Sequence, residues 1–153
     1  MVLIEKSKRR LSLIRDGETR FCCPISLGVC PEGHKQREGD GRTPEGRYRL
    51  CSVNHNSKYH LSLGVSYPSR RDALRARREG RLGLEDCLLI AAADLLRLRP
   101  KWTSPLGGYI MIHGESPEGK AGDWTQGCIA LCNQDIETLA SLCKRGERIE
   151  IKP

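Results

Sequence analysis

Glycine and proline are the residues that most constrain how this chain can fold. Sixteen glycines and eight prolines divide the 153 residues into short segments. Glycine tolerates the backbone angles of tight turns, and proline cannot continue a helix or a central strand, so this punctuation favours a β-rich fold over a helix bundle. Many of the segments alternate between apolar and polar residues, as half-buried strands do. We expect strands at 2–5, 11–14, 19–27, 47–53, 58–65, 109–113, 128–131 and 147–151, and a long surface loop over 28–46.

The stretch between Pro68 and Lys101 differs, because its apolar residues recur with a helical period. Ser69 can cap a basic helix that runs to about Glu79, and a second helix follows until Pro100 stops it. We expect the second helix to bury one stripe, made of Leu84, Leu88, Ala91, Leu95 and Leu98 and widened by Leu89, Ala92 and Leu96. A last helix is predicted from a cap at Asn133 to about Arg145.

The net positive charge indicates one possible class of function, which is binding to an anionic partner. The chain has 26 Lys and Arg against 19 Asp and Glu, which would suit a basic nucleic-acid-binding module. The span 70–101 carries nine of the basic and five of the acidic residues. Its basic helices would ordinarily be a solvated face, and alternatively a lid that attracts an anionic polymer.

No stretch predicts a membrane span or a secretion signal. A transmembrane helix needs roughly 18 consecutive apolar residues, and the longest apolar run, 87–93, falls far short of this. At the N-terminus, Met1-Val2-Leu3-Ile4 precedes a basic cluster, which is the reverse of a signal peptide's order.

The eight cysteines follow no recognisable framework. They stand at 22, 23, 30, 51, 87, 128, 132 and 143, without a single Cys-x-x-Cys pair. Cys23, Cys30 and His34 are the nearest approach to a zinc spacing and lack the tight two-ligand knuckle of structural sites. Most of these cysteines therefore read as small apolar core residues, and His34 and His55 as solvated loop residues. No metal or other cofactor is expected.

One cysteine stands in a context of its own, between 108 and 131. A buried segment ends in His113-Gly114, a polar Gly-rich loop follows, and Gly127-Cys128 begins another apolar segment. A thiolate is the attacking form of cysteine, and a neighbouring imidazole can generate it at neutral pH. The amides of Gln126, Gly127 and Cys128 are candidates for stabilising an oxyanion. The alternative is that Cys128 is a small buried residue and His113 a hydrogen-bonded strand-end histidine.

The residues of this region resemble a known family. His113-Gly114, followed by Thr125-Gln126-Gly127-Cys128-Ile129-Ala130-Leu131, is similar to the His-Gly and Ser/Thr-x-Gly-Cys signature of the L,D-transpeptidase (YkuD) domain. Upstream, Thr43-Pro44-Glu45-Gly46 resembles the family's Thr-Pro-x-Gly turn. Similarity to the YafK-like branch lies in 59–63, in Tyr67-Pro68 and in Asp123-Trp124-Thr125. The resemblance to the family covers most of the chain, except a helical insertion at about 77–104.

The resemblance implies a fold, a site and a reaction. The fold is a β-sandwich-like mixed sheet with a few helices, in a single domain over 1–153. Cys128 would be the nucleophile, His113 its base, and the Gly114 carbonyl the group that orients the imidazole. Tyr59, His60, Tyr67, Trp124 and Thr125 are candidates for substrate binding, though aromatic residues on strands often serve packing instead.

The family's reaction is acyl transfer on peptidoglycan stem peptides. The donor would be cleaved between diaminopimelate and a terminal D-alanine, and an amine of a second stem or a lipoprotein lysine would accept it. Water as the acceptor would give hydrolysis, as in relatives that release a lipoprotein. The resemblance implies the periplasm or cell envelope. Many relatives carry Arg two positions after the cysteine, where this chain has Ala130.

Overall fold

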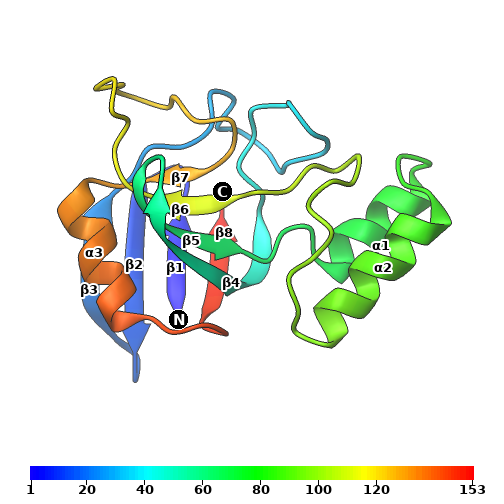
Figure 1. Cartoon of the computed structure of the whole chain (residues 1–153), viewed down its shortest axis with the longest axis horizontal. Coiled ribbons are helices and arrows are strands. Elements are labelled where there is room, and N and C mark those ends of the chain that lie inside the picture. Colours follow the sequence, from blue (N-terminus) through cyan, green and yellow to red (C-terminus); the bar gives the residue numbers. More distant parts are fainter.

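A mixed sheet of eight strands, in the spatial order β3-β2-β1-β8-β4-β5-β6-β7, forms the body of the protein. This computed structural model describes all 153 residues. The strands are β1 (Val2–Glu5), β2 (Arg10–Arg15), β3 (Glu18–Pro24), β4 (Gly46–Ser57), β5 (His60–Val65), β6 (Met111–His113), β7 (Ile129–Ala130) and β8 (Arg148–Lys152). The helices are α1 (Arg70–Arg78), α2 (Leu84–Leu95) and α3 (Asn133–Leu142) (Figure 1). The prediction of a mainly β fold with a few helices is confirmed.

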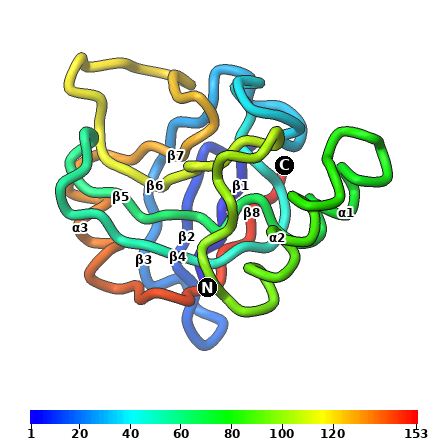
Figure 2. The backbone as a smooth tube through the Cα atoms, turned by 45° about the vertical axis from the view of Figure 1, so that its right-hand side comes forward, coloured from blue at the N-terminus to red at the C-terminus, as the bar shows by residue number.

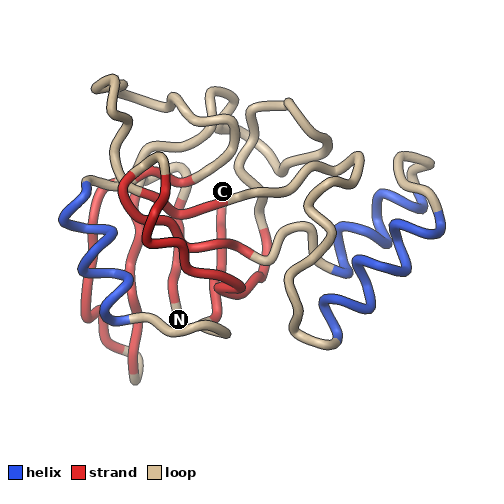
Figure 3. Tube along the Cα trace, viewed as in Figure 1, coloured by secondary structure: helices blue, strands red, loops and turns tan.

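The sheet mixes parallel and antiparallel pairs. β8 lies parallel to β1 and antiparallel to β4, so the last strand joins the first three strands to the later ones. β6 and β7 are also parallel, with Ile112 opposite Ile129. Alternate residues of the strands, such as Val2, Ile4, Ile149 and Ile151, are buried in one apolar core. α3 contributes Ile136 and Leu139 to that core and packs beside β5 and β6, at the left of Figure 3.

Several predicted boundaries shift, each where the backbone hydrogen bonds change partner. β6 begins at Met111 and not at Tyr109, because Tyr109 has a φ of +54° and leaves the extended conformation. β7 contains only Ile129 and Ala130, because the Cys128 carbonyl accepts a hydrogen bond from the Thr125 hydroxyl. α3 is capped by Cys132 one residue before the predicted Asn133, and it ends at Leu142.

α1 and α2 form an antiparallel hairpin that stands at one end of the molecule (Figure 1). Ser69 caps α1 as predicted, in a capping box with Asp72. The predicted buried stripe of α2 is wrong: the helix buries Cys87 and Ile90, and its leucines are exposed. The periodicity correctly predicted a helix but not which side of it is buried, because no strand of the sheet covers the leucine side of α2. None of the three helices is long and apolar enough to cross a membrane.

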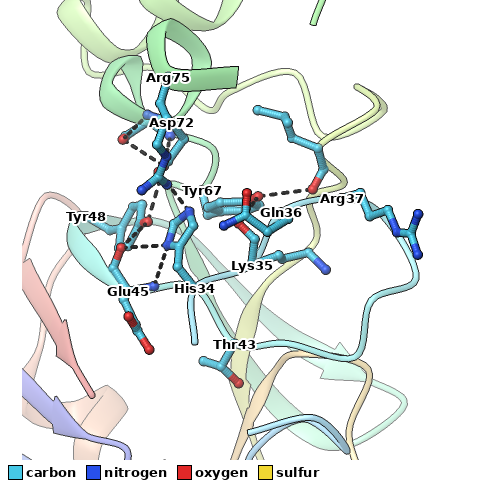
Figure 4. A network of polar contacts seen from close by, with 12 residues as sticks. His34, Lys35, Gln36, Arg37, Thr43, Glu45, Tyr48, Tyr67, Asp72 and Arg75 are labelled. Atoms are coloured by element: carbon cyan, nitrogen blue, oxygen red, sulfur yellow. Dashed lines mark hydrogen bonds and ion pairs between the residues drawn. The ribbon is translucent and has the colours of Figure 1, made fainter. Parts of the chain in front are cut away.

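A buried polar network ties the hairpin to the long loop and to β4 (Figure 4). The Asp72 carboxylate, 6 % exposed, accepts from the Ser69 amide and hydroxyl and from the Tyr48 hydroxyl. His34 Nε2 lies 3.3 Å from the same carboxylate, and Arg75 pairs with it. His34 Nδ1 accepts from the Glu45 amide, so the expectation of a solvated His34 is wrong. The loop therefore has a fixed anchor at this end.

Asp72→Ala is expected to destabilise the protein by about 3 kcal/mol, because it leaves several buried donors without an acceptor. Burial alone would raise the pKa of the Asp72 carboxyl, but hydrogen bonds from His34 and Ser69 outweigh it and hold the pKa below 3.8. The stabilisation is thus complete above about pH 5 and is lost as the pH falls through that lowered pKa. Urea unfolding at several pH values measures both effects. Glu18→Ala, which removes an exposed ion pair with Arg20, is the control, and equal losses in both variants would contradict the network's role.

Candidate active site

The candidate site lies where β6 and β7 run side by side. β6 ends in His113 and β7 begins directly after Cys128, and the loop 114–127 connects them above the sheet edge (Figure 2). In the register of the two strands, His113 is opposite Ala130. The same register places Cys128 level with Met111, the first residue of β6, so His113 and Cys128 lie two register positions apart on neighbouring strands.

His113 is held in one tautomer and in one plane. Nδ1 lies 2.8 Å from the Gly114 carbonyl oxygen. Because a carbonyl can only accept, Nδ1 carries the proton and Nε2 keeps its lone pair. The ring is 2 % exposed, stacks on Tyr59 at a centroid distance of 4.5 Å and meets Trp124 edge-on at 5.6 Å. Burial lowers the pKa of His113, against the opposing effect of the Gly114 carbonyl. The histidine is therefore neutral and basic at Nε2 near neutral pH.

Cys128 is held by two backbone groups at the start of β6. Its thiol donates to the Tyr109 carbonyl oxygen, and Sγ accepts from the Met111 amide, both over 3.4 Å. Burial raises the pKa of the Cys128 thiol, and the Met111 amide partly offsets this. Both Cys128 and His113 are thus uncharged in this arrangement, and no direct hydrogen bond joins them. The thiol needs a base to become a nucleophile, and His113 Nε2 is the free basic atom of the site.

The turn that carries Cys128 depends on a glycine. Gly127 has a φ of +121°, and a Cβ there would lie 2.5 Å from the Arg42 carbonyl oxygen. The Thr125 hydroxyl donates to the Cys128 carbonyl oxygen over 2.7 Å and accepts from the Gly127 amide over 3.1 Å. The loop 28–46 thus supports the turn from behind, and Thr125 closes it from within.

This geometry corrects two of the predicted roles. Thr125 is 3 % exposed and makes both of its side-chain hydrogen bonds within the turn, so it shapes the turn and does not contact solutes. The Gly127 amide is occupied by Thr125 and is not a free oxyanion donor. The amides of Gln126 and Cys128 make no hydrogen bond within the protein and remain candidates for that role.

The four predicted aromatic substrate residues divide into two groups. Tyr59 and Trp124 lie against His113 and against each other. Tyr67 is fully buried and donates to the Leu106 carbonyl oxygen, and His60 pairs with Glu137 of α3 at 2.5 Å. Burial removes Tyr67 from any surface that a substrate could reach, so that expectation is wrong.

A hollow of about 450 Å³ opens beside Trp124 and has Ala130 in its wall. Ala130 is almost completely buried, and its small side chain leaves this space open. Glu115, Lys120 and Cys132 also line the hollow and supply its polar groups. The position where many relatives carry Arg thus forms part of the wall of this hollow.

Several supporting residues went unrecognised in the sequence. Asp123 accepts from Arg9 through both carboxylate oxygens and from the Leu27 amide, which fixes the end of the loop before Trp124. The Asn133 side chain accepts from the Glu115 amide and packs against Gly114. Arg9 lies 114 residues before its partner, so no local pattern could have revealed the contact. Asp123 was at least marked by its Asp-Trp-Thr motif.

The zinc reading of the sequence finds no support in the geometry. Cys23 is buried in the core, Cys30 is exposed, and His34 belongs to the Asp72 network. No three His, Cys, Asp or Glu side chains lie together in a way that could hold a metal ion. All eight cysteines are free thiols, and Cys22, Cys30 and Cys132 are exposed, so the expectation that the remaining cysteines are core residues fails for these three.

A mixed β-sheet that carries a buried, carbonyl-oriented histidine and a strand-end cysteine on neighbouring strands defines a class of cysteine-containing catalytic domain. The chain matches the family described as "YkuD: L,D-transpeptidase catalytic domain" over residues 1–151 and belongs to it. The family resemblance is thereby confirmed.

Solved structures share the fold. The helical cell shape determining protein Pgp2 from Campylobacter jejuni is 26 % identical with a TM-score of 0.68, and Bd1075 from Bdellovibrio bacteriovorus is 24 % identical with a TM-score of 0.62. The alignments cover 99 % and 98 % of this chain but 47 % and 46 % of those proteins. L,D-transpeptidase 1 from Mycobacterium tuberculosis aligns over 99 % of this chain and 60 % of its own, at 14 % identity and a TM-score of 0.55. The chain spans about half the length of the first two. No curated protein matches it.

Proposed function

We propose that this protein is a peptidoglycan L,D-transpeptidase that works through a thioester on Cys128. The observation that carries the proposal is the His113 tautomer, with Nδ1–H donated to the Gly114 carbonyl and Nε2 free, on the strand whose first residue, Met111, hydrogen-bonds to Cys128. In this arrangement the backbone carbonyl plays the orienting part that a carboxylate plays in other triads. Membership of the YkuD family supplies the substrate class, which is the stem peptide of peptidoglycan.

The first half-reaction uses both uncharged groups. His113 Nε2 takes the proton of the Cys128 thiol, which gives up its hydrogen bond to the Tyr109 carbonyl. The thiolate attacks the carbonyl carbon between diaminopimelate and the terminal D-alanine, and the free amides of Gln126 and Cys128 stabilise the oxyanion. His113 then returns the proton to the amine of the departing D-alanine. The donor stem remains attached to Sγ as a thioester.

The second half-reaction decides the product. An amine of a second stem or of a lipoprotein lysine, deprotonated by His113, attacks the thioester and restores the thiol. Water in the same place would give a shortened stem or release a bound lipoprotein. The hollow beside Trp124 and Ala130 is the space that we assign to the acceptor, and Trp124, which packs edge-on against His113, separates the two. An enzyme with these substrates acts in the periplasm or cell envelope.

The test is incubation of the protein with disaccharide tetrapeptide, followed by intact-mass analysis of the protein and chromatography of the muropeptides. We expect an acyl-enzyme adduct on the Cys128 peptide, released D-alanine and dimeric muropeptides. A carbapenem, which can acylate the same thiol, should add its mass once and block the reaction. Tripeptide products without dimers would assign the protein to hydrolysis. Absence of any adduct and of any product would refute the thioester mechanism.

A further inference from the structure

The outer side of the helical hairpin, residues 70–99, presents an apolar surface that no other part of the chain covers. Eleven large apolar side chains of the protein are exposed, and seven of them belong to the hairpin, each between 44 and 69 % exposed. They are Leu74, Leu84, Leu88, Leu89, Leu95, Leu96 and Leu98. Single exposed leucines are ordinary, whereas a group of this density marks a surface that contacts something apolar.

The leucines are ordered along α2. Leu84, Leu88 and Leu95 are spaced by four and seven residues, so they follow one line along the helix from its first turn to its last. Leu89 and Leu96 form a second line beside them, and Glu85 is the only charged residue between the two lines. The opposite side buries Cys87 and Ile90. α2 therefore turns a broad apolar face away from the protein.

The same hairpin carries a set of arginines without carboxylate partners. Its acids are nearly all paired: Asp72 with Arg75, Glu79 with Arg81, Asp86 with Lys101 and Asp94 with Arg49. Only Glu85 is left without a cation. Six arginines make no ion pair, namely Arg70, Arg71, Arg77, Arg78, Arg97 and Arg99, and the last of these lies over the Trp102 ring. Four of them surround Leu74 on the exposed side of α1.

We propose that the hairpin docks this protein on an anionic membrane surface. A free polyanion would satisfy the arginines and leave the leucines in water. A second copy would cover the leucines but would bring two sets of unpaired arginines together. An anionic bilayer offers lipid phosphates to the arginines and the acyl boundary to the leucines at once. Because no helix can span a bilayer, the hairpin lies in the plane of the interface.

The docked orientation leaves the candidate active site uncovered. The hairpin occupies one end of the molecule, and the loop 114–127 with the ends of β6 and β7 lies apart from it (Figure 1, Figure 2). Docking through the hairpin is thus independent of the proposed catalytic function. A Cys128→Ser variant is expected to bind vesicles as the unchanged protein does.

Vesicle flotation of the full chain tests the proposal, with phosphatidylglycerol–phosphatidylcholine vesicles against pure phosphatidylcholine vesicles. We expect binding to the anionic vesicles that weakens as salt is added. Two variants separate the contributions: a triple Leu84→Ser, Leu88→Ser, Leu95→Ser change and a quadruple Arg70→Gln, Arg71→Gln, Arg77→Gln, Arg78→Gln change. Each should reduce binding by at least about tenfold, the arginine set with loss of the anionic preference. The matched control combines Leu142→Ser on α3 with Arg148→Gln on β8, both exposed, and should bind normally.

Hydrogen exchange of the unchanged protein gives a second readout that does not depend on variants. Anionic vesicles should slow exchange in the exposed turns of α1 and α2 and leave β1 to β3 as before. The proposal is overturned by equal binding to both vesicle types, by a leucine variant that binds like the unchanged protein, or by exchange protection elsewhere. It is also overturned by a dimer that the leucine changes dissolve, which would assign the face to a second copy.

Discussion

We expect Cys128→Ser to lower the rate of the proposed transpeptidase reaction at least about a thousandfold. No acyl adduct should be detected in the mass of the variant protein. The hydroxyl of serine fits the space of the thiol and can keep the hydrogen bonds to the Tyr109 carbonyl and the Met111 amide. Its pKa, however, is far above that of a thiol, so His113 cannot convert it into a useful nucleophile. The measurement is D-alanine release from disaccharide tetrapeptide, with intact-mass analysis in parallel.

The chain provides controls for this change, because Cys30 and Cys132 are likewise free thiols and are exposed. Cys30→Ser and Cys132→Ser should retain the rate within about twofold, since neither thiol takes part in the chemistry. Cys132 lines the hollow beside Trp124, so its variant also shows whether the hollow tolerates a small polar change. A Cys128→Ser protein that keeps its activity would place the nucleophile elsewhere.

His113→Gln is expected to lower the rate by about 10²- to 10⁴-fold, because the site loses its base. The pH profile makes the role specific. The neutral imidazole is the working form, and burial holds the pKa of His113 below 6.5, so the rate of the unchanged protein should rise with pH through a midpoint below 6.5. The pH–rate profile of the glutamine variant should lack this rise. His55→Gln, in an exposed part of β4, is the control and should keep both the rate and its rise with pH.

Tyr59 provides a check on how His113 is oriented. Tyr59→Phe preserves the stacked ring and should act like the unchanged protein, whereas Tyr59→Leu removes the stack and should lower the rate by about tenfold. If both variants behave alike, the stacking does not orient the imidazole.

The candidate site was foreseen from sequence to the extent that its parts are local. His113 and Cys128 each stand next to a glycine, Gly114 and Gly127, at the ends of apolar segments, and those signals place them at strand ends. The failures have one physical cause, which is that a pattern gives no information about the partner across space. Thr125 and Tyr67 carry groups suited to binding a substrate, but the turn and the core use those groups first. Arg9 reaches Asp123 only because the fold brings the turn between β1 and β2 to the loop 114–127.

The fold shows the same limit in α2. A 3.6-residue period reveals a helix with an apolar side, and burial of that side depends on whether another element lies over it. In α3 such an element exists, and Ile136 and Leu139 are buried as an apolar stripe should be. In α2 it does not, and Leu84 and Leu95 face outward. An apolar stripe predicts a contact, and the identity of the contact comes from the structure.

The position of β8 has a consequence for how the chain acquires its fold. Its five residues are the last strand in sequence, yet they lie at the centre of the sheet between β1 and β4. Val2 pairs with Ile149, so closure of the sheet joins residues near opposite ends of the chain. Pairings of such long sequence separation slow folding, since the loop entropy is lost before the contact forms. Until residues 148–152 have left the ribosome, β1 to β3 and β4 to β7 each present an open strand edge, and this interval is when the nascent protein most needs protection from aggregation.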